Sequence, residues 1–302
     1  MGSFARLRSR LRRRDCVGYV YILPWILGFL CLQLYPLASS LWYSFTNYSG
    51  FGEAAFIGLE NYKNIFRFDY NFGQSLKVTL LYVGITVPLK LMFALFIAML
   101  LSVPLRGVNV FRTIYYIPSI LGSSVAVATL WRFMFMKDGM FNNLLSAVGI
   151  KTQIDWIGDS RFALLTISLL SVWQFGSSMV IFLAGLKQIP RDLYEAASID
   201  GASKVRQFFV ITVPMLTPII FFNIIMQTIT AFQDFTAPFL ITAGGPANGT
   251  YLYGMYLYDN AFRYYKMGYA SALSWILFAI IIAFTLLLFQ TSAKWVFYTE
   301  DE

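Results

Sequence analysis

Six apolar stretches of membrane-spanning length constrain this chain more than any other feature. Each is close to the ~20 apolar residues with which an α-helix crosses a bilayer. Lipid offers no hydrogen bonds to backbone groups, so such stretches must satisfy their own N–H and C=O groups by forming helices. The sequence therefore predicts an all-α polytopic membrane protein with six transmembrane helices, over residues 17–42, 76–102, 113–135, 162–185, 216–240 and 268–290.

The residue types that most enzymes need are scarce. The 302 residues include no histidine, which excludes histidine acid–base catalysis, Ser-His triads and the usual zinc sites. The charged fraction of 13% leaves few acids inside the apolar stretches to act as catalytic groups or metal ligands. Cys16 and Cys31 share one predicted helix and lie about 22 Å apart, too far for an intrachain disulfide. We expect no catalytic residue, metal site or cofactor in this chain.

Basic residues gather at the ends of the predicted helices, and their distribution sets the expected orientation. Residues 1–16 carry six arginines, which the positive-inside rule keeps in the cytoplasm. A signal peptide begins similarly, but its apolar core is shorter and ends at a small-residue cleavage site, so a retained anchor is favoured. Six crossings leave 17–290 as the transmembrane domain and place the 186–215 loop and the 291–302 tail in the cytoplasm. The net charge of +8 reflects this asymmetry, and we expect no nucleic-acid partner.

The loop over residues 186–215 is polar and helix-forming although it lies between two apolar stretches. Asp192 is expected to cap a short helix, with Glu195 three residues later as in a capping box. Gly201 suits the left-handed position that closes a helix, and Ser203 suits the N-cap of the next one. The loop is therefore expected to form a helical hairpin, and local physics leaves open whether Glu195 only caps its helix or contacts another protein.

The same loop resembles the EAA loop of bacterial ABC-importer permeases. That pattern reads E-A-A, three residues, G, nine residues and I-x-L-P, and Val213 stands here in place of the leucine. The resemblance implies a type I ABC-importer permease fold, in which this loop is the coupling helix that receives motion from a cytoplasmic ATPase. The implied ATPase-coupling residues are Glu195, Ala196, Ala197, Asp200, Gly201, Ile211 and Pro214.

The C-terminal part of the chain resembles the permeases of maltose, glycerol-phosphate and oligosaccharide importers. The matching residues are mostly small or aromatic. They are Gly244, Gly245, Pro246, Tyr256, Tyr258, Ala261, Phe262, 268–272 and 295–298. The resemblance implies carbohydrate import by alternating access across a bacterial inner membrane. It also implies a second homologous permease, a dimer of ABC ATPases and an extracytoplasmic solute-binding protein as partners. ATP and Mg would be bound by the ATPase, because this sequence has no G-x-x-x-x-G-K-[ST] loop.

Five polar side chains within the predicted helices are candidates for the solute path. Polar groups inside a membrane are costly and usually functional. Asn223 and Gln227 are four residues apart and share one helical face, where amides can bond sugar hydroxyls or, alternatively, a neighbouring helix. Gln174 offers the same two possibilities. Lys90 can pair with Asp234, face an acidic solute, or extend toward the membrane interface.

Two other functions stay open as alternatives to an ATP-driven permease. An ion-driven secondary transporter usually carries carboxylates on an ion path, and Asp234 is the one clear candidate for such a role. A membrane-embedded enzyme needs convergent acids, bases or metal ligands, and the sequence offers no such set. The identity of the sugar, including whether it is acidic, is left undetermined.

Overall fold

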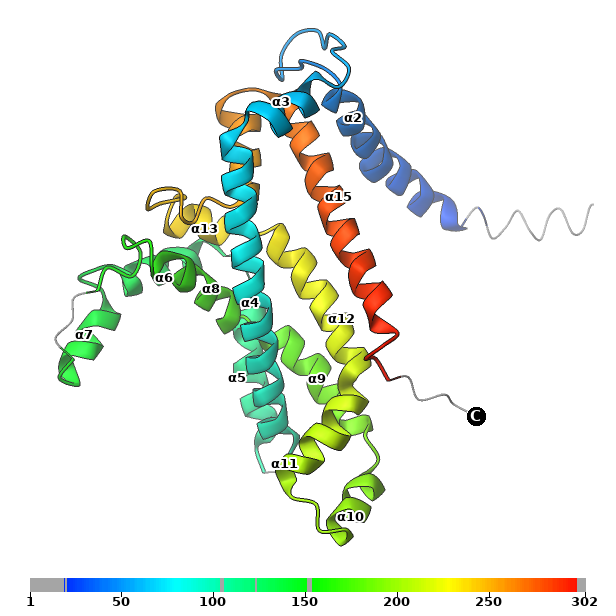
Figure 1. Ribbon diagram of the computed structural model, residues 1–302, viewed down its shortest axis with the longest axis vertical. Helices are drawn as coiled ribbons and strands as arrows, with labels where there is room; N and C mark the ends of the chain where they lie inside the picture. Colours follow the sequence, from blue (N-terminus) through cyan, green and yellow to red (C-terminus); the bar gives the residue numbers. More distant parts are fainter. Residues whose placement is uncertain (1–18, 20, 104–105, 123, 151–153, 298–302) are drawn as a thin grey trace, which may run out of the picture. The chain divides into compact units, whose positions relative to one another are not determined.

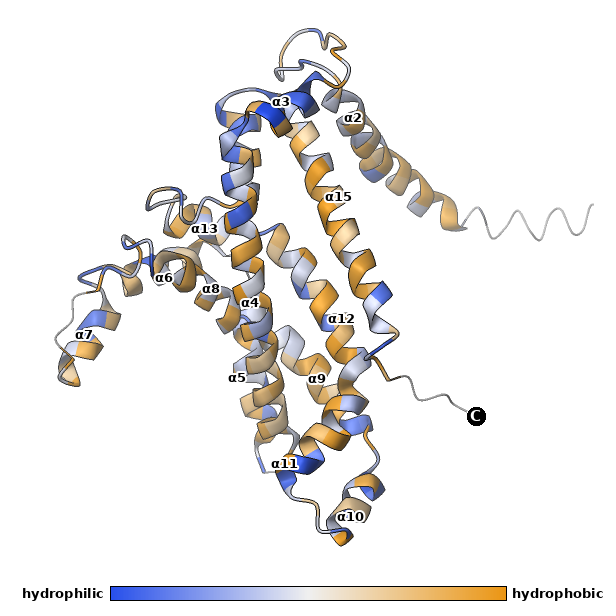
Figure 2. Cartoon of the chain, viewed as in Figure 1, coloured by the Kyte–Doolittle hydropathy of each residue, from blue (hydrophilic) through white to orange (hydrophobic). Residues whose placement is uncertain are grey.

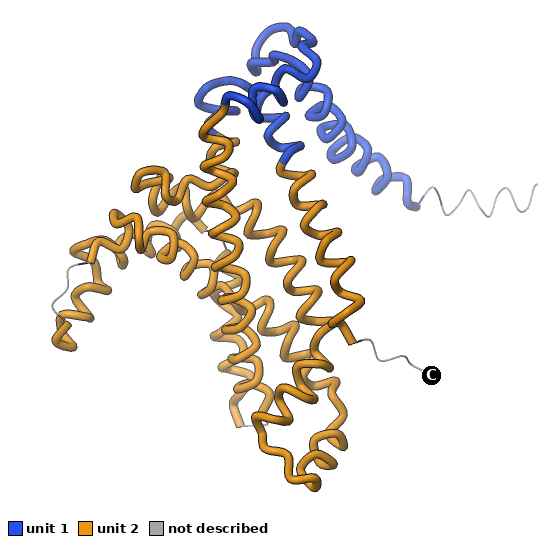
Figure 3. Tube along the Cα trace, viewed as in Figure 1, with its two compact units in different colours: residues 1–68, 259–276 blue, residues 69–258, 277–302 orange. Residues whose placement is uncertain are grey.

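The computed structural model describes residues 19, 21–103, 106–122, 124–150 and 154–297, and Figure 1 shows their helices. The chain divides into two compact units, described separately below (Figure 3). Unit 1 comprises Met1–Phe68 and Asp259–Ile276, and unit 2 comprises Asp69–Tyr258 and Leu277–Glu302. The predicted basic segment 1–16 and the end of the predicted tail, from 298 onward, lie outside the described residues.

Within the described ranges, four helices are long and apolar enough to cross a membrane on their own: Tyr21–Ser44, Tyr70–Ser102, Lys204–Phe232 and Met267–Ser292. Two bent pairs can each make one more span. They are Val108–Leu121 with Val125–Ala147, bent by 100°, and Ala163–Trp173 with Gly176–Gln188, bent by 49°. Each predicted span therefore has a counterpart, but the predictions of continuous helices over 113–135 and 162–185 are wrong.

The two breaks have local causes. Gly122 follows the end of α5 (Val108–Leu121) with φ +52° and ψ −148°, a backbone conformation that glycine adopts without a Cβ penalty. The second break separates α8 (Ala163–Trp173) from α9 (Gly176–Gln188), and Gln174 between them has φ −84° and ψ 38°. Neither break contains a proline, and the apolar pattern continues on both sides of it. The pattern therefore did not indicate that a helix ends there.

The fifth span is shifted toward the N-terminus and is longer than predicted. The sequence predicted 216–240, whereas the helix runs from Lys204 to Phe232 through α11 (Lys204–Gln207), the π-helical turn η2 (Phe208–Thr212) and α12 (Val213–Phe232). Pro214 lies in the first turn of α12, where a missing N–H is tolerated. The chain leaves the helix at Gln233 and resumes at α13 (Thr236–Ile241).

Unit 1 contains the first apolar helix, which includes η1 (Leu30–Leu34) and α2 (Tyr35–Ser44), together with α3 (Glu60–Phe68), η3 (Asp259–Arg263) and the start of α15 (Met267–Ser292). The buried Asn61 amide donates to the carbonyls of Ser44 and Thr46, at 2.9 Å each. These bonds satisfy carbonyls at the end of α2 that have no partner within the helix. Gly268 N–H also donates to the Tyr48 carbonyl at 2.8 Å, which ties the start of α15 to the loop after α2.

Unit 2 is built around α4 (Tyr70–Ser102), which packs against α8, α9, α12 and α14 (Tyr253–Tyr258). Asp69 caps α4, accepting from the N–H groups of Asn71 and Phe72 at 2.9 and 3.1 Å. One side of α4 is buried, whereas Leu81, Met92 and other large apolar side chains are exposed, as expected of a surface in contact with lipid. Figure 2 shows the same apolar character along α12 and α15.

The helices α5 and α9 meet almost backbone to backbone. A Cβ at Gly176 would lie 2.7 Å from the Tyr115 carbonyl oxygen and 2.8 Å from the Tyr116 Cα. Beside this contact, the Ser119 hydroxyl donates to the Gln174 carbonyl at 3.0 Å and accepts from the Ser177 N–H at 3.1 Å. Only glycine therefore fits at position 176.

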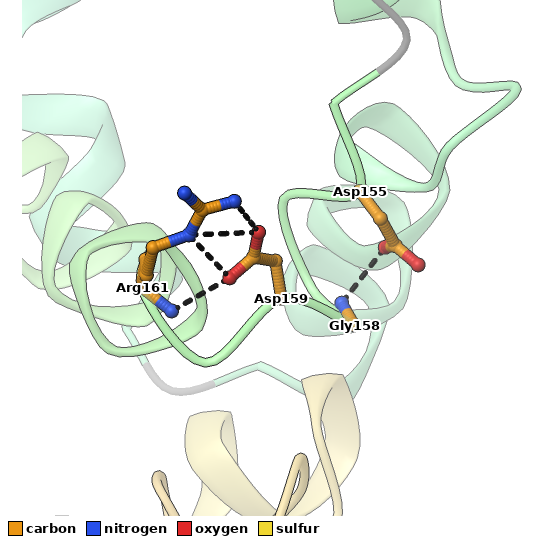
Figure 4. A network of polar contacts seen from close by, with 4 residues as sticks. All are labelled: Asp155, Gly158, Asp159 and Arg161. Carbon is orange, nitrogen blue, oxygen red and sulfur yellow. Dashed lines mark hydrogen bonds and ion pairs between the residues drawn. The ribbon is translucent and has the colours of Figure 1, made fainter.

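The segment between α6 (Val125–Phe135) and α8 is folded around Asn142 of α7 (Met140–Ala147). The Asn142 amide donates to the Lys137 and Ile154 carbonyls at 2.7 Å each and accepts from the Trp156 indole at 2.8 Å. These bonds fix the segment from three directions. In the turn that follows, Asp155 accepts from Gly158 N–H at 2.7 Å (Figure 4).

An exposed ion pair closes the same turn. Arg161 Nη2 lies 2.6 Å from Asp159 Oδ2, and the Arg161 N–H donates to Oδ1 at 2.9 Å (Figure 4). Hydrogen bonds from the Arg161 side chain, followed by the bond from its backbone N–H, lower the pKa of Asp159 to about 2. The pair is local and lies ahead of α8, outside the apolar helices.

Candidate functional site

A polar cavity of about 290 Å³ lies in the apolar part of unit 2. Its wall is formed by α4, α8, α12 and the break between α12 and α13. Irregular backbone at membrane depth is tolerated where it lines a cavity, and here the break brings Gln233 and Asp234 into the wall. The lining residues are Tyr82, Thr86, Val87, Lys90, Ser171, Gln174, Gln227, Thr230, Ala231, Gln233, Asp234, Phe235 and Thr236.

Asp234 is held by two hydroxyl groups from other helices. Tyr82 of α4 donates its hydroxyl hydrogen to Asp234 Oδ2 at 2.5 Å, and Ser171 of α8 lies 3.5 Å from the same oxygen. The Tyr82 and Ser171 hydroxyl oxygens are 2.7 Å apart, so the three groups form one cluster. Hydrogen bonds to a carboxylate are stronger than neutral ones, and this cluster links α4, α8 and the break after α12, which are distant in sequence.

Lys90 lines the same cavity and is attracted electrostatically by Asp234 without contacting it. Lys90 is buried, with 9% of its surface exposed. It nevertheless makes no hydrogen bond or ion pair with any residue that the structure describes. The predicted alternative of an ion pair between Lys90 and Asp234 is therefore not formed in this structure. The burial of Lys90 among the lining residues is consistent with a side chain directed into the cavity.

The three predicted amides differ in their surroundings. Gln174 lines the cavity, and its Nε2 donates to the Gly122 carbonyl at 2.8 Å, so it also connects the two helix breaks. Gln227 lines the cavity as well. Asn223, at 1% exposure, does not line it: its amide donates back to the Ile219 carbonyl of its own helix at 3.0 Å. The structure therefore brings together Lys90, Gln174, Gln227 and Asp234, and leaves Asn223 apart.

Sequence reasoning missed Tyr82, Thr86 and Ser171, although a signal existed for two of them. Tyr82, Thr86 and Lys90 are spaced by four residues along an otherwise apolar helix, so they lie on one face. From this spacing, the residues of α4 that line the cavity could have been predicted. Ser171 carried no such signal, since a single serine in an apolar helix often bonds to its own backbone.

The predicted loop forms a helical hairpin at one end of unit 2 (Figure 1). We use the term hairpin for residues 191–212, which comprise α10 (Arg191–Ile199), α11 and η2. Gly201 has φ +75°, and Ser203 caps α11 by accepting from Arg206 N–H at 3.4 Å, both as predicted. The predicted Asp192 cap is wrong. Because Pro190 is the N-cap, α10 begins two residues earlier than predicted and Asp192 lies within its first turn.

The first helix of the hairpin is open to its surroundings. None of the nine described residues of α10 is buried, and Glu195, Ala196, Asp200 and Gly201 are exposed while Ala197 is half-buried. Two apolar side chains, Ile199 at 86% and Val205 at 67%, are also exposed. An exposed surface of small and apolar residues suits contact with another protein.

Side-chain hydrogen bonds join α10 to the start of the long apolar helix. The Tyr194 hydroxyl lies 2.8 Å from the Thr212 hydroxyl, and the buried Gln207 amide donates to Ser198 Oγ at 2.9 Å. Ile211 and Pro214, the last predicted coupling positions, lie in η2 and in the first turn of α12, both half-buried. A displacement of α10 would therefore be transmitted to α12, whose other end lines the cavity.

Comparison with known proteins agrees with this arrangement. The family described as "Binding-protein-dependent transport system inner membrane component" matches residues 80–297. The probable ABC transporter permease protein YesP of Bacillus subtilis (strain 168) is 52% identical over 304 residues, covering 100% of this chain and 98% of that protein. The lactose transport system permease protein LacF of Rhizobium radiobacter is 35% identical, covering 95% and 98%.

A solved structure shows the same fold. The crystal structure of a bacterial alginate ABC transporter, in complex with an alginate pentasaccharide-bound periplasmic protein, contains a chain that matches with a TM-score of 0.79. The identity is 20%, and the match covers 93% of this chain and 95% of that one. Together, the apolar helices, the family match over most of the chain and these relatives establish that the chain belongs to the inner membrane components of binding-protein-dependent transport systems, as a membrane-spanning ABC transporter permease.

Proposed function

We propose that this permease carries a carbohydrate across a bacterial inner membrane, driven by ATP that separate subunits hydrolyse. The observation that carries the proposal is the cavity, in which hydroxyl, amide and carboxylate groups converge inside an apolar helical unit. Polar groups at this depth are costly unless they serve a solute. Amides and carboxylates are suitable partners for sugar hydroxyls. The name of LacF and the alginate ligand of the solved relative support the same substrate class.

The hairpin supports the proposed source of energy. Its exposed α10 would contact an ATPase through Glu195, Ala196, Ala197 and Asp200, with Gly201 closing the helix. Closure of the ATPase dimer would move α10, and the Tyr194–Thr212 and Gln207–Ser198 bonds would pass this motion to α12. Ile211 and Pro214 lie on the connection between them.

The proposed assembly contains four further chains. A second homologous permease would complete the membrane path, two ABC ATPases would bind ATP and Mg, and an extracytoplasmic solute-binding protein would deliver the sugar. The hairpin would lie in the cytoplasm with both termini. Its basic residues Arg191, Lys204 and Arg206 favour that side of a membrane.

The proposal predicts that transport requires both ATP and the partner ATPase. We would reconstitute the permease pair in vesicles, with the binding protein outside and labelled oligosaccharides as probes, and measure uptake with and without the ATPase subunits. Uptake is expected only when the ATPase and ATP are both present. Uptake driven by an ion gradient without any ATPase would refute the proposal in favour of a secondary transporter.

A further inference from the structure

We propose that the cavity selects a saccharide with a single negative charge, such as a uronic acid, and that Lys90 binds its carboxylate. The inference rests on the proposed carbohydrate import and names the substrate class of the same cavity. It follows from three properties of the cavity: an unpaired buried cation, a carboxylate that already has partners, and a polar lining for hydroxyl groups.

The first property is the state of Lys90. Its side chain lines the cavity and is almost fully buried, but among the described residues nothing accepts a hydrogen bond from it. Asp234 attracts Lys90 electrostatically without forming an ion pair with it. A buried ammonium group without a hydrogen-bonding partner is costly, and its three N–H donors remain available. Such a group is compensated when an anion enters the cavity beside it.

The second property is the state of Asp234. Its Oδ2 already accepts a hydrogen bond from the Tyr82 hydroxyl at 2.5 Å and lies 3.5 Å from the Ser171 hydroxyl, and no ion pair with Lys90 is formed. The carboxylate is thus held against α4 and α8 by hydroxyl groups. A carboxylate has several acceptor sites, so Asp234, which lines the cavity, can also accept from a sugar hydroxyl.

The charges together determine which anion fits. In the described lining, Lys90 is the one cation and Asp234 the one anion. Asp234 repels any anion in the cavity, and it repels a dianionic phosphate about twice as strongly as a single carboxylate. A neutral sugar would leave Lys90 with only the electrostatic attraction of Asp234. A single carboxylate pairs with Lys90 at the lowest electrostatic cost.

The third property is the remaining lining. Gln227, Thr230 and Gln233 offer amide and hydroxyl groups, which suit the hydroxyls of a sugar ring. The volume of about 290 Å³ is at the lower end for ligand pockets, so the cavity fits a small part of an oligosaccharide. One uronic acid residue therefore accounts for both the charge and the hydroxyl partners.

The test compares acidic and neutral sugars of the same configuration. Labelled galacturonate, glucuronate and mannuronate disaccharides, with their neutral galactose, glucose and mannose counterparts, would be bound to the assembled importer in nanodiscs. The solute-binding protein is left out, so that the measured selectivity belongs to the cavity. The variant is Lys90→Met. The control is Lys77→Met, because Lys77 is exposed on the same helix and does not line the cavity.

We expect the acidic member of at least one pair to bind about tenfold more tightly than its neutral counterpart, a difference that Lys90→Met removes and Lys77→Met leaves. Affinity for the neutral sugar should not fall in Lys90→Met. Equal binding of both members, or an equal loss of both in Lys90→Met, overturns the inference but leaves carbohydrate import intact. Absence of binding for all six sugars overturns the inference and the proposed function together.

Discussion

The cavity and the hairpin lie in the same unit but are stabilised in opposite ways. The cavity depends on contacts between residues far apart in sequence, such as Tyr82 with Asp234, and its polar groups are buried. The hairpin depends on bonds between neighbours, such as Gln207 with Ser198, and its first helix has no buried residue. The polar groups of the cavity contact other parts of the chain, whereas the first helix of the hairpin presents its surface outward.

Because of this difference, we expect the two regions to depend differently on a partner protein. In the cavity, hydrogen bonds from α4 and α8 position the Asp234 carboxylate, and such support helps a binding site to keep its geometry. An exposed short helix gains little stability from its own packing, since helices of this length are marginal in water. The hairpin is therefore expected to respond to a partner, and substitutions in the two regions should alter different measured quantities.

The largest expected effect comes from charge reversal on the hairpin. Glu195→Lys should abolish ATP-driven transport, because loss of a central interface contact costs about 2 kcal/mol or more, which is roughly 30-fold in affinity. Glu195 is exposed, so the fold and sugar binding in the cavity should be unchanged. Uptake, ATPase association and sugar binding would be measured on the same preparation.

The matched control is Glu60→Lys, since Glu60 is also an exposed acid in the first part of a helix, in unit 1. This variant should transport normally. If Glu195→Lys retained full uptake and ATPase association, the exposed surface of α10 would not be the contact with the ATPase.

A smaller effect is expected from deleting one hydroxyl in each region. Tyr82→Phe removes the donor to the Asp234 carboxylate and should cost about 1.5 kcal/mol, seen as weaker sugar binding. Tyr194→Phe removes the bond to Thr212 and should cost about 0.5–1 kcal/mol, seen as less transport per ATP hydrolysed. If both variants changed the same quantity, binding or coupling, the separation of the two regions would be wrong.

The smallest effect is expected at the exposed turn that belongs to neither region. The pKa of Asp159 is lowered to about 2, so its pairing with Arg161 contributes above the unfolded value of about 3.9 and is lost as pH falls toward 2. Carboxyl NMR should show a midpoint near 2 in the wild type and a higher midpoint in Arg161→Gln, which loses the side-chain bonds but keeps the backbone N–H bond to Asp159. Sugar binding and coupling should be the same in both proteins. A wild-type midpoint near 4 would show that the pair does not form in solution.

Local rules predicted the hairpin better than the cavity. Gly201 and Ser203 were placed correctly because a left-handed closing residue and a serine cap depend on adjacent residues alone. The predicted Asp192 cap was wrong by two residues, because Pro190 is also compatible with the start of a helix. Where several neighbouring residues are each suitable as an N-cap, the sequence pattern does not determine which one begins the helix.

The apolar pattern predicted the long helices but not their interruptions. Hydropathy is high on both sides of Gly122 and of Gln174, so a continuous span and a broken one give the same signal. The breaks depend on tertiary contacts, such as the bond from Gln174 to the Gly122 carbonyl. For the same reason, the sequence could nominate Lys90 and Asp234 for the solute path but could not show that Tyr82 and Ser171 hold the carboxylate.

The glycine contact between α5 and α9 has a consequence for motion. Interfaces made of side chains can adjust through rotamer changes, but at Gly176 backbone lies against backbone, so no side chain is available to take up a shift. The two helices have lost the freedom to slide past one another at this point. If the permease exposes its path to one side and then the other, we expect this pair to move together at the Gly176 contact. The changes in backbone torsion angles during such a motion are then expected in the interrupted segments, where Gln174 and Gln233 already lie outside helices.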